Sequence, residues 1–201
     1  MKRQMKTAAA VLLGLLAMTA CEKKPKNEVK GAAIEAVERD TWHYFSFTTG
    51  AEVGTGKENV EDNGLWFART DWDMAVNRYN IRTNSGAATS VGAQGGVYTF
   101  GDNVTFDAAE LPAGADFVAD KAVKEESMGT DSITTIKSGA AVVRFKTNAE
   151  GEMIMPPQFM KAPVYAFRTA DGLGYYKVAF TQYQNEAGES GHVRFDFEKM
   201  N

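Results

Sequence analysis

Cysteine and histidine are scarce in this chain of 201 residues, which has one cysteine, Cys21, and two histidines, His43 and His192. A single cysteine excludes an internal disulfide. Two histidines far apart in the chain do not supply the ligand cluster of a zinc site. A Ser-His-Asp triad would have to use one of them, yet His43 lies in an aromatic segment and no GxSxG elbow surrounds any serine. The scarcity therefore argues against hydrolytic and zinc-dependent chemistry, and we expect no catalytic residues.

Long apolar runs are absent except at the N-terminus, where one extends from Ala8 to Ala17 behind three basic residues. The run is too short for a permanent transmembrane helix. Together with Ala20-Cys21 it is typical of a bacterial lipoprotein signal, in which Cys21 becomes the lipidated first residue. We therefore expect residues 1–20 to be the signal peptide. A cleaved signal followed by an incidental cysteine is the alternative.

Lipidation would anchor the chain to a membrane without spanning it. Residues 21–33 are expected to form the lipidated cysteine and a flexible tether, because EKKPKNEVK has few large apolar groups. Residues 34–201 then form the folded domain. Glu22 is not an obvious inner-membrane retention signal, which favours the outer membrane.

Positive charge is also in short supply. Removing the three basic residues of the signal leaves 19 basic against 26 acidic residues, a net charge of −7. A nucleic-acid partner needs a basic surface, so this class of partner is not expected. Phosphate-cradling GxxxxGK[ST] is missing, and the glycines of 92–96 precede a strand-like segment, so they indicate a turn.

What the chain does have is a succession of short aromatic and β-branched segments separated by turn residues. In the last of them Val193, Phe195 and Phe197 alternate with charged residues, which is the period of a half-buried strand. This pattern predicts a single all-β domain, a sandwich or open barrel-like fold with projecting loops and a hairpin. Two short helices are expected at 29–39 and 116–126. Strands are expected at 41–49, 73–83, 97–100, 104–106, 140–147, 164–169, 175–183 and 192–200.

The segment 120–160 differs from the rest because it has few aromatics and most of the methionines outside the signal. These are Met128, Met153, Met155 and Met160, interspersed with prolines that interrupt strand pairing. Strand periodicity places Met153 and Met155 on one face. Methionine usually fills gaps in a core, but its thioether is also a soft ligand for haem iron. Projecting loops are where binding sites tend to lie.

The three tryptophans offer a different function. Trp42, Trp66 and Trp72 would stack on sugar rings if they were exposed, although their apolar neighbours favour core packing. A surface glycan-binding or adhesive lipoprotein is therefore the alternative to haem binding.

One longer motif is similar to a known family. The block DWDMAVNRYNIRTNSG at 71–86, with GGVY at 95–98 and GHVRF at 191–195, resembles the HmuY-type haemophores. The resemblance extends over essentially the whole chain after the signal. It implies an all-β fold shaped like a hand that holds one haem between loops. It also implies an outer-membrane lipoprotein, released in some members, that passes haem to a TonB-dependent receptor for iron acquisition, with host haemoproteins as candidate haem sources.

The founding type of this family binds iron through two histidines of the central loop and hairpin. This chain has no histidine between His43 and His192, and methionines replace the pair in some relatives. We therefore predict Met128 and Met155 as the axial ligands. Met128 lies in a loop of small residues, and Met155 precedes a proline that favours an extended backbone. Met153 is the first substitute and Met160 the second.

Overall fold

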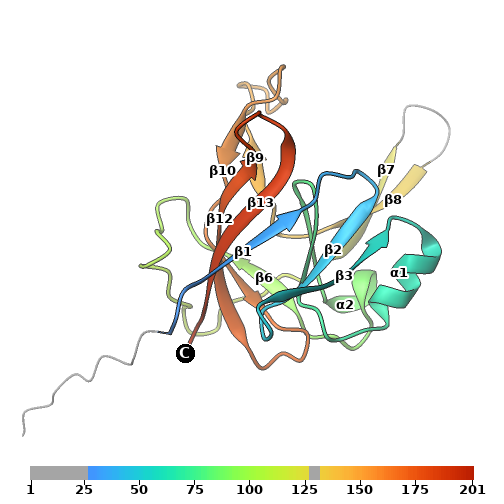
Figure 1. Cartoon of the computed structure of the whole chain (residues 1–201), viewed down its shortest axis with the longest axis vertical. Helices are drawn as coiled ribbons and strands as arrows, with labels where there is room; N and C mark the ends of the chain where they lie inside the picture. The colour runs from blue at the N-terminus through green and yellow to red at the C-terminus, as the bar shows by residue number, and fades with distance from the viewer. Residues whose placement is uncertain (1–26, 127–131) are drawn as a thin grey trace, which may run out of the picture.

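The computed structural model describes residues 27–126 and 132–201 and shows an antiparallel β-sandwich (Figure 1). Its larger sheet has five strands in the order β1-β13-β12-β11-β6, and its smaller sheet has four in the order β3-β2-β4-β5. The bounds in the larger sheet are Lys30–Glu35 (β1), Ser190–Lys199 (β13), Tyr175–Gln184 (β12), Tyr165–Arg168 (β11) and Gly96–Thr99 (β6). In the smaller sheet they are Ala51–Lys57 (β3), Thr41–Ser46 (β2), Met74–Asn77 (β4) and Asn80–Thr83 (β5).

Two further hairpins and two short helices complete the fold. The hairpins are β7 (Lys121–Glu126) with β8 (Ser132–Lys137), and β9 (Val143–Phe145) with β10 (Phe159–Lys161). The helices are α1 (Val60–Phe67) and α2 (Gly86–Thr89). Neither sheet closes on itself, so the prediction of an all-β sandwich or open fold is confirmed. Neither described helix is long and apolar enough to cross a membrane.

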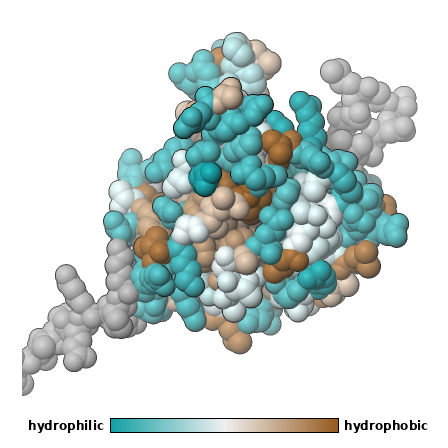
Figure 2. Space-filling model, viewed as in Figure 1, coloured by the Kyte–Doolittle hydropathy of each residue, from teal (hydrophilic) through white to brown (hydrophobic). Residues whose placement is uncertain are grey.

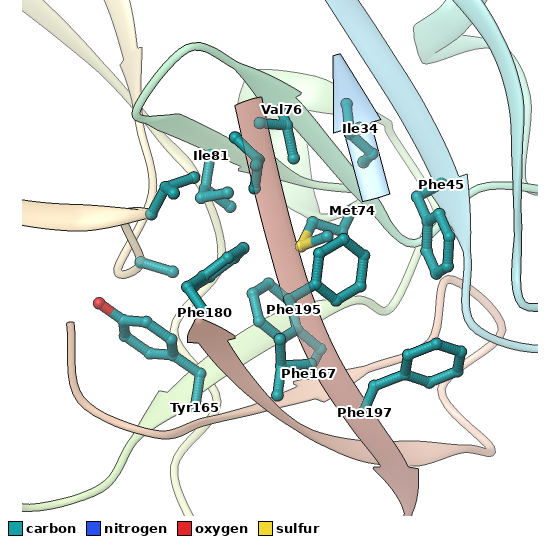
Figure 3. Packing of buried hydrophobic residues seen from close by; sticks show 14 of the residues in the cluster. Ile34, Phe45, Met74, Val76, Ile81, Tyr165, Phe167, Phe180, Phe195 and Phe197 are labelled. Atoms are coloured by element: carbon teal, nitrogen blue, oxygen red, sulfur yellow. The ribbon is translucent and has the colours of Figure 1, made fainter. Parts of the chain in front are cut away.

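The main core lies between the two sheets and is rich in phenylalanine. Figure 3 shows Phe45, Met74 and Val76 of the smaller sheet facing Phe195 and Phe197 of the larger sheet. The Phe45 and Phe195 rings meet edge to face with their centroids 5.1 Å apart. Full burial of each such side chain contributes about 1.5–3 kcal/mol, so this aromatic layer is the main source of stability.

Helix α1 packs on the outer face of the smaller sheet. Helix α1 places Trp66 over Tyr44, with ring centroids 3.9 Å apart and the planes 6° from parallel. Trp72, Trp66 and Trp42 are 0%, 7% and 5% exposed. The glycan-binding alternative, which needed exposed tryptophans, therefore loses its support.

The outer face of the larger sheet is covered by the irregular segment 100–117. The alternation expected in β13 is present, since Val193, Phe195 and Phe197 are buried in the main core. Glu198 on the opposite face is nevertheless buried as well, and it pairs with Lys177 at 3.2 Å. The Lys177 ammonium in turn lies 4.8 Å from the Phe106 ring centroid.

Several predicted elements are wrong. Residues 30–35 of the first expected helix form β1, and residues 121–126 of the second form β7. Residues 104–106 form no strand, and the expected strand 73–83 is a hairpin that turns at Arg78, whose φ is 51°. For residues 30–35, pairing with the distant strand β13 overrode a weak local preference. Helix α1 and strand β3 were not predicted.

Candidate ligand site on two projecting arms

Two hairpins project beyond the sandwich and are the candidate positions for a ligand site (Figure 1). We call residues 121–137, built on β7 and β8, the first arm. We call residues 143–161, built on β9 and β10, the second arm. Projecting loops and one hairpin were expected at 120–160, and the structure places two hairpins there.

The methionines of the second arm are exposed, unlike a core methionine. Met155 is 74% exposed, and Met153 and Met160 are 44% and 43% exposed, whereas Met74 in the main core is 0% exposed. The gap-filling role that is usual for methionine therefore holds for Met74 and not for these three. Met128 lies outside the described residues, so its role as a ligand stays a prediction.

Backbone hydrogen bonds make the second arm an ordered hairpin beyond its short strands. Lys146 N–H donates to the carbonyl of Gln158 at 3.0 Å, and Ile154 N–H donates to the carbonyl of Lys146 at 3.1 Å. Near the tip, a turn is closed by Gly151 N–H donating to the Asn148 carbonyl at 3.1 Å. Met153 and Met155 are thus carried on a hydrogen-bonded scaffold that presents them to solvent.

Four aromatic rings connect the second arm to the sandwich. Phe145 of β9 and Phe159 of β10 lie 5.4 Å apart, between centroids. Phe145 meets Tyr79 of the β4–β5 turn at 4.9 Å, and Phe159 meets Tyr183 of β12 at 5.0 Å. Phe159 remains 36% exposed. The sequence analysis missed this set, because its members are distant in the chain and each is an ordinary strand aromatic.

Two hollows flank the foot of the second arm, and Met160 and Lys161 line both. One, of about 400 Å³, is also lined by Phe159 and Tyr183; the other, of about 410 Å³, reaches Val104 in the cover of the larger sheet. Both volumes lie within the usual range of small-ligand pockets. In Figure 2 the projecting top of the molecule is mostly polar, with isolated apolar side chains among the polar ones.

Positive charge is available on the second arm. Lys146 and Lys161 are exposed, while Arg144 is held by Asp102 at 2.6 Å. An apolar ligand with carboxylate groups would find both exposed thioethers and ammonium groups along this hairpin. Within the described ranges no three His, Cys, Asp or Glu side chains gather as ligands for a metal ion.

Both histidines lie on strands of the sandwich and contact carboxylates. His43 Nδ1 is 3.2 Å from Glu52 Oε1 on the neighbouring strand. His192 Nδ1 contacts Glu35 Oε2, and its Nε2 lies 3.1 Å from Asn185 Nδ2. Neither histidine lies on an arm.

The long motif at 71–86 is buried and organises the scaffold. Asp73 accepts hydrogen bonds from the backbone N–H of Phe47 at 2.8 Å and of Ala170 at 2.9 Å. Asn77 donates to the carbonyls of Arg39 and Thr41 at 2.9 and 2.8 Å. Asp73 and Asn77 of the motif therefore tie distant segments of the scaffold together.

Comparison with known proteins agrees with the motif. The family model described as "HmuY protein" matches residues 38–197. None of the curated proteins matches the chain.

Three solved structures share the fold at 20% identity. An HmuY-like heme binding protein from Bacteroides vulgatus gives a TM-score of 0.59 over 85% of this chain and 91% of that one. A protein described as a lipoprotein from Bacteroides fragilis gives 0.57 over 86% and 91%. An apo HmuY analog from Tannerella forsythia gives 0.59 over 88% and 99%.

Proposed function

Because the chain belongs to the HmuY family, we propose that it binds haem and carries it at the cell surface without chemically altering it. Family membership over residues 38–197 is the observation that carries this proposal. It is supported by exposed thioethers on a projecting hairpin, where a flat apolar ligand can reach them.

The available donors fit the iron of haem. Thioether sulfur is a known axial ligand of haem iron, and it favours the ferrous over the ferric state relative to imidazole. We propose Met155 on the second arm and Met128 on the first arm as the two ligands, with Met153 and Met160 as substitutes. Two axial side chains would leave no open position on iron for oxygen chemistry, which suits a carrier and not an enzyme.

The porphyrin ring would need apolar contact and its propionates would need solvent or cations. The half-exposed ring of Phe159 offers apolar contact at the foot of the second arm, and the exposed Lys146 and Lys161 offer positive charge. A thioether carries no proton that would compete with iron. Ligation by methionine would therefore persist at acid pH, where a histidine ligand would protonate.

We further propose a lipid anchor at Cys21, an outer-membrane location and delivery of haem to a TonB-dependent receptor. The similarity to a protein described as a lipoprotein supports the anchor. Cys21 and residues 1–20 lie outside the described residues, and the sequence predicted a tether that ends at residue 33. Strand β1 already begins at Lys30, so residues 30–33 belong to the sheet.

The test is a haem titration of residues 22–201 with and without dithionite. We expect a sharpened and shifted Soret band with resolved α and β bands in the reduced sample. A spectrum equal to that of free haemin in both redox states would refute haem binding.

The same titration assigns the ligands. Met128→Ala and Met155→Ala should each weaken ferrous haem binding, and the double variant should lose most of it while remaining folded. His43→Ala and His192→Ala serve as controls and should leave the spectrum unchanged. Loss of the low-spin spectrum with Met153→Ala or Met160→Ala would transfer the assignment to that substitute.

A further inference from the structure

The buried carboxylate of Asp120 lies at the base of the first arm. Asp120 immediately precedes β7 and is 4% exposed. Its Oδ2 accepts a hydrogen bond from the Thr83 backbone N–H at 2.9 Å, and its Oδ1 accepts one from the Thr83 hydroxyl at 2.6 Å. Thr83 is the last residue of β5, so these two bonds join the start of the arm to the smaller sheet.

The same carboxylate reaches two other segments. The hydroxyl of Thr89, at the end of α2, donates to Asp120 Oδ2 at 3.1 Å. Ser138, the residue directly after β8, lies close enough to the Asp120 carboxyl to lower its pKa. The carboxylate therefore holds the start of the hairpin against β5 and α2, and the residue that follows the hairpin lies close to it.

The backbone next to Asp120 is fixed as well. Asp120 N–H donates to the Ser85 hydroxyl at 2.9 Å. Val118 exchanges backbone hydrogen bonds of 2.9 and 3.0 Å with Val97 of β6. A Cβ added at Gly86, where φ is +62°, would lie 3.2 Å from the Ala119 Cβ, so α2 packs closely on this segment. The chain is thus held up to the residue where the arm begins.

The partners named for Asp120 are neutral hydroxyl and amide groups. Burial raises the pKa of its carboxyl above the ordinary value, because desolvation outweighs the hydrogen bonds from Thr83 and Thr89. A neutral asparagine fits the same place. Its oxygen can accept from the Thr83 amide and the Thr89 hydroxyl, and its NH₂ can donate to the Thr83 hydroxyl oxygen. Alanine would instead leave these buried donors without an acceptor.

We propose that Asp120 is a positioning residue that fixes the direction in which the first arm leaves the sandwich, and that the affinity of the ligand site depends on it. The second half of this inference rests on the proposed function, because it assumes that haem is held between the two arms. Groups that orient a metal ligand typically change metal affinity by about 10- to 100-fold when they are removed.

Asp73 provides a matched control. It is also a 4% exposed aspartate whose carboxylate accepts hydrogen bonds from two distant segments, and burial raises its pKa too. Its partners, Phe47 and Ala170, lie in the sandwich and not at an arm. Asp73→Ala should therefore destabilise the fold without altering the first arm specifically.

The first measurement needs no haem. Amide hydrogen exchange of residues 121–137 is compared with that of β12 in the wild type, Asp120→Ala, Asp120→Asn and Asp73→Ala. The readout is the ratio of the exchange rate in the first arm to that in β12. We expect Asp120→Ala to raise this ratio and Asp120→Asn to bring it most of the way back to the wild-type value. Asp73→Ala should leave the ratio unchanged. Equal exchange ratios in Asp120→Ala and the wild type would overturn the positioning role.

The second measurement is the affinity for haemin under dithionite at a temperature where every variant is folded. Asp120→Ala should bind about 10- to 100-fold more weakly, while Asp120→Asn and Asp73→Ala should bind like the wild type. Unchanged affinity in Asp120→Ala, despite faster exchange in the first arm, would overturn the dependence of the site on this residue.

The outcomes separate this inference from the proposed function. A wild type that binds no haem would refute the function, while the exchange ratios would still decide whether Asp120 positions the arm. If Asp120→Ala fails to fold, Thr89→Val removes one donor with little change of shape. Thr89→Val should accelerate exchange in the first arm and weaken haemin binding, each by less than is expected for Asp120→Ala. No change in either measurement would overturn the inference.

Discussion

The contrast between Met155 and Met74 gives the sharpest test of how this chain uses methionine. Met155 is 74% exposed on the second arm, and Met74 is 0% exposed between the two sheets. Truncation of a buried methionine to alanine costs about 2–5 kcal/mol, because apolar contact is lost and a cavity remains. Exposed side chains away from such features usually change stability by less than about 0.5 kcal/mol.

These magnitudes convert into melting temperatures. For a domain of this size, 1 kcal/mol shifts Tm by roughly 2–4 °C. Met74→Ala should therefore lower Tm by roughly 4–20 °C. Met155→Ala should lower Tm by less than about 2 °C. Thermal unfolding followed by circular dichroism in the absence of haem measures both shifts.

Ligand binding should show the opposite order. Met155→Ala should lose affinity for ferrous haem and its low-spin spectrum should change, because an axial donor is removed. Met74→Ala, measured well below its Tm, should retain the wild-type spectrum, because this side chain lies in the core. If Met155→Ala lowered Tm as much as Met74→Ala, or kept an unaltered six-coordinate spectrum, the assignment of Met155 as an available ligand would be wrong.

Three further perturbations test the anchor, the packing and the electrostatics. Cys21→Ser should abolish acylation and move the protein from membrane to soluble fractions, and continued partition with outer membranes would contradict the anchor. Gly56→Ala would place a Cβ 2.5 Å from Trp66 Nε1 and should destabilise by about 1–3 kcal/mol. Gly64 lies inside α1, and a Cβ added there would have no neighbouring atom within 4 Å, so Gly64→Ala should instead stabilise by about 0.5–1 kcal/mol. Denaturant unfolding measures the change in unfolding free energy of both variants. A change of the same sign in both would refute the packing argument. Burial raises the pKa of Asp73 above its ordinary 3.8, so its contribution to stability is fully present below that pH and is lost as pH rises through the raised value. Stability of the wild type relative to Asp73→Asn should therefore fall as pH rises from 3.8, and a rise would contradict the sign.

The class of fold and the family could both be predicted from the residues alone. Alternating segments such as Val193, Phe195 and Phe197 have only one face that can be buried, so their strand character follows from the residues alone. The motif at 71–86 indicated the family, and polar residues of the motif such as Asp73 and Asn77 are buried in the structure. Exposure of Met153, Met155 and Met160 was also foreseeable, since the prolines and small residues around them cannot build a core.

Features that depend on partners distant in the chain could be recognised only in the folded molecule. Residues 30–35 could have been a short helix, and they became β1 because β13 offers them a paired edge. The exposed face of β13 was expected to be solvated, yet Glu198 is buried because the segment 100–117 folds over it.

The ends of the two arms illustrate the same limit. Asp120 is an ordinary aspartate in the sequence, and it ties the start of the first arm to the sandwich only because β5 and α2 bring Thr83 and Thr89 to it. Likewise, Phe145, Phe159 and Tyr183 become one aromatic cluster only when β9, β10 and β12 meet. Local patterns determine which residues can be strands and loops, while the contacts that position a ligand site arise between segments whose separation in sequence leaves no periodic signal.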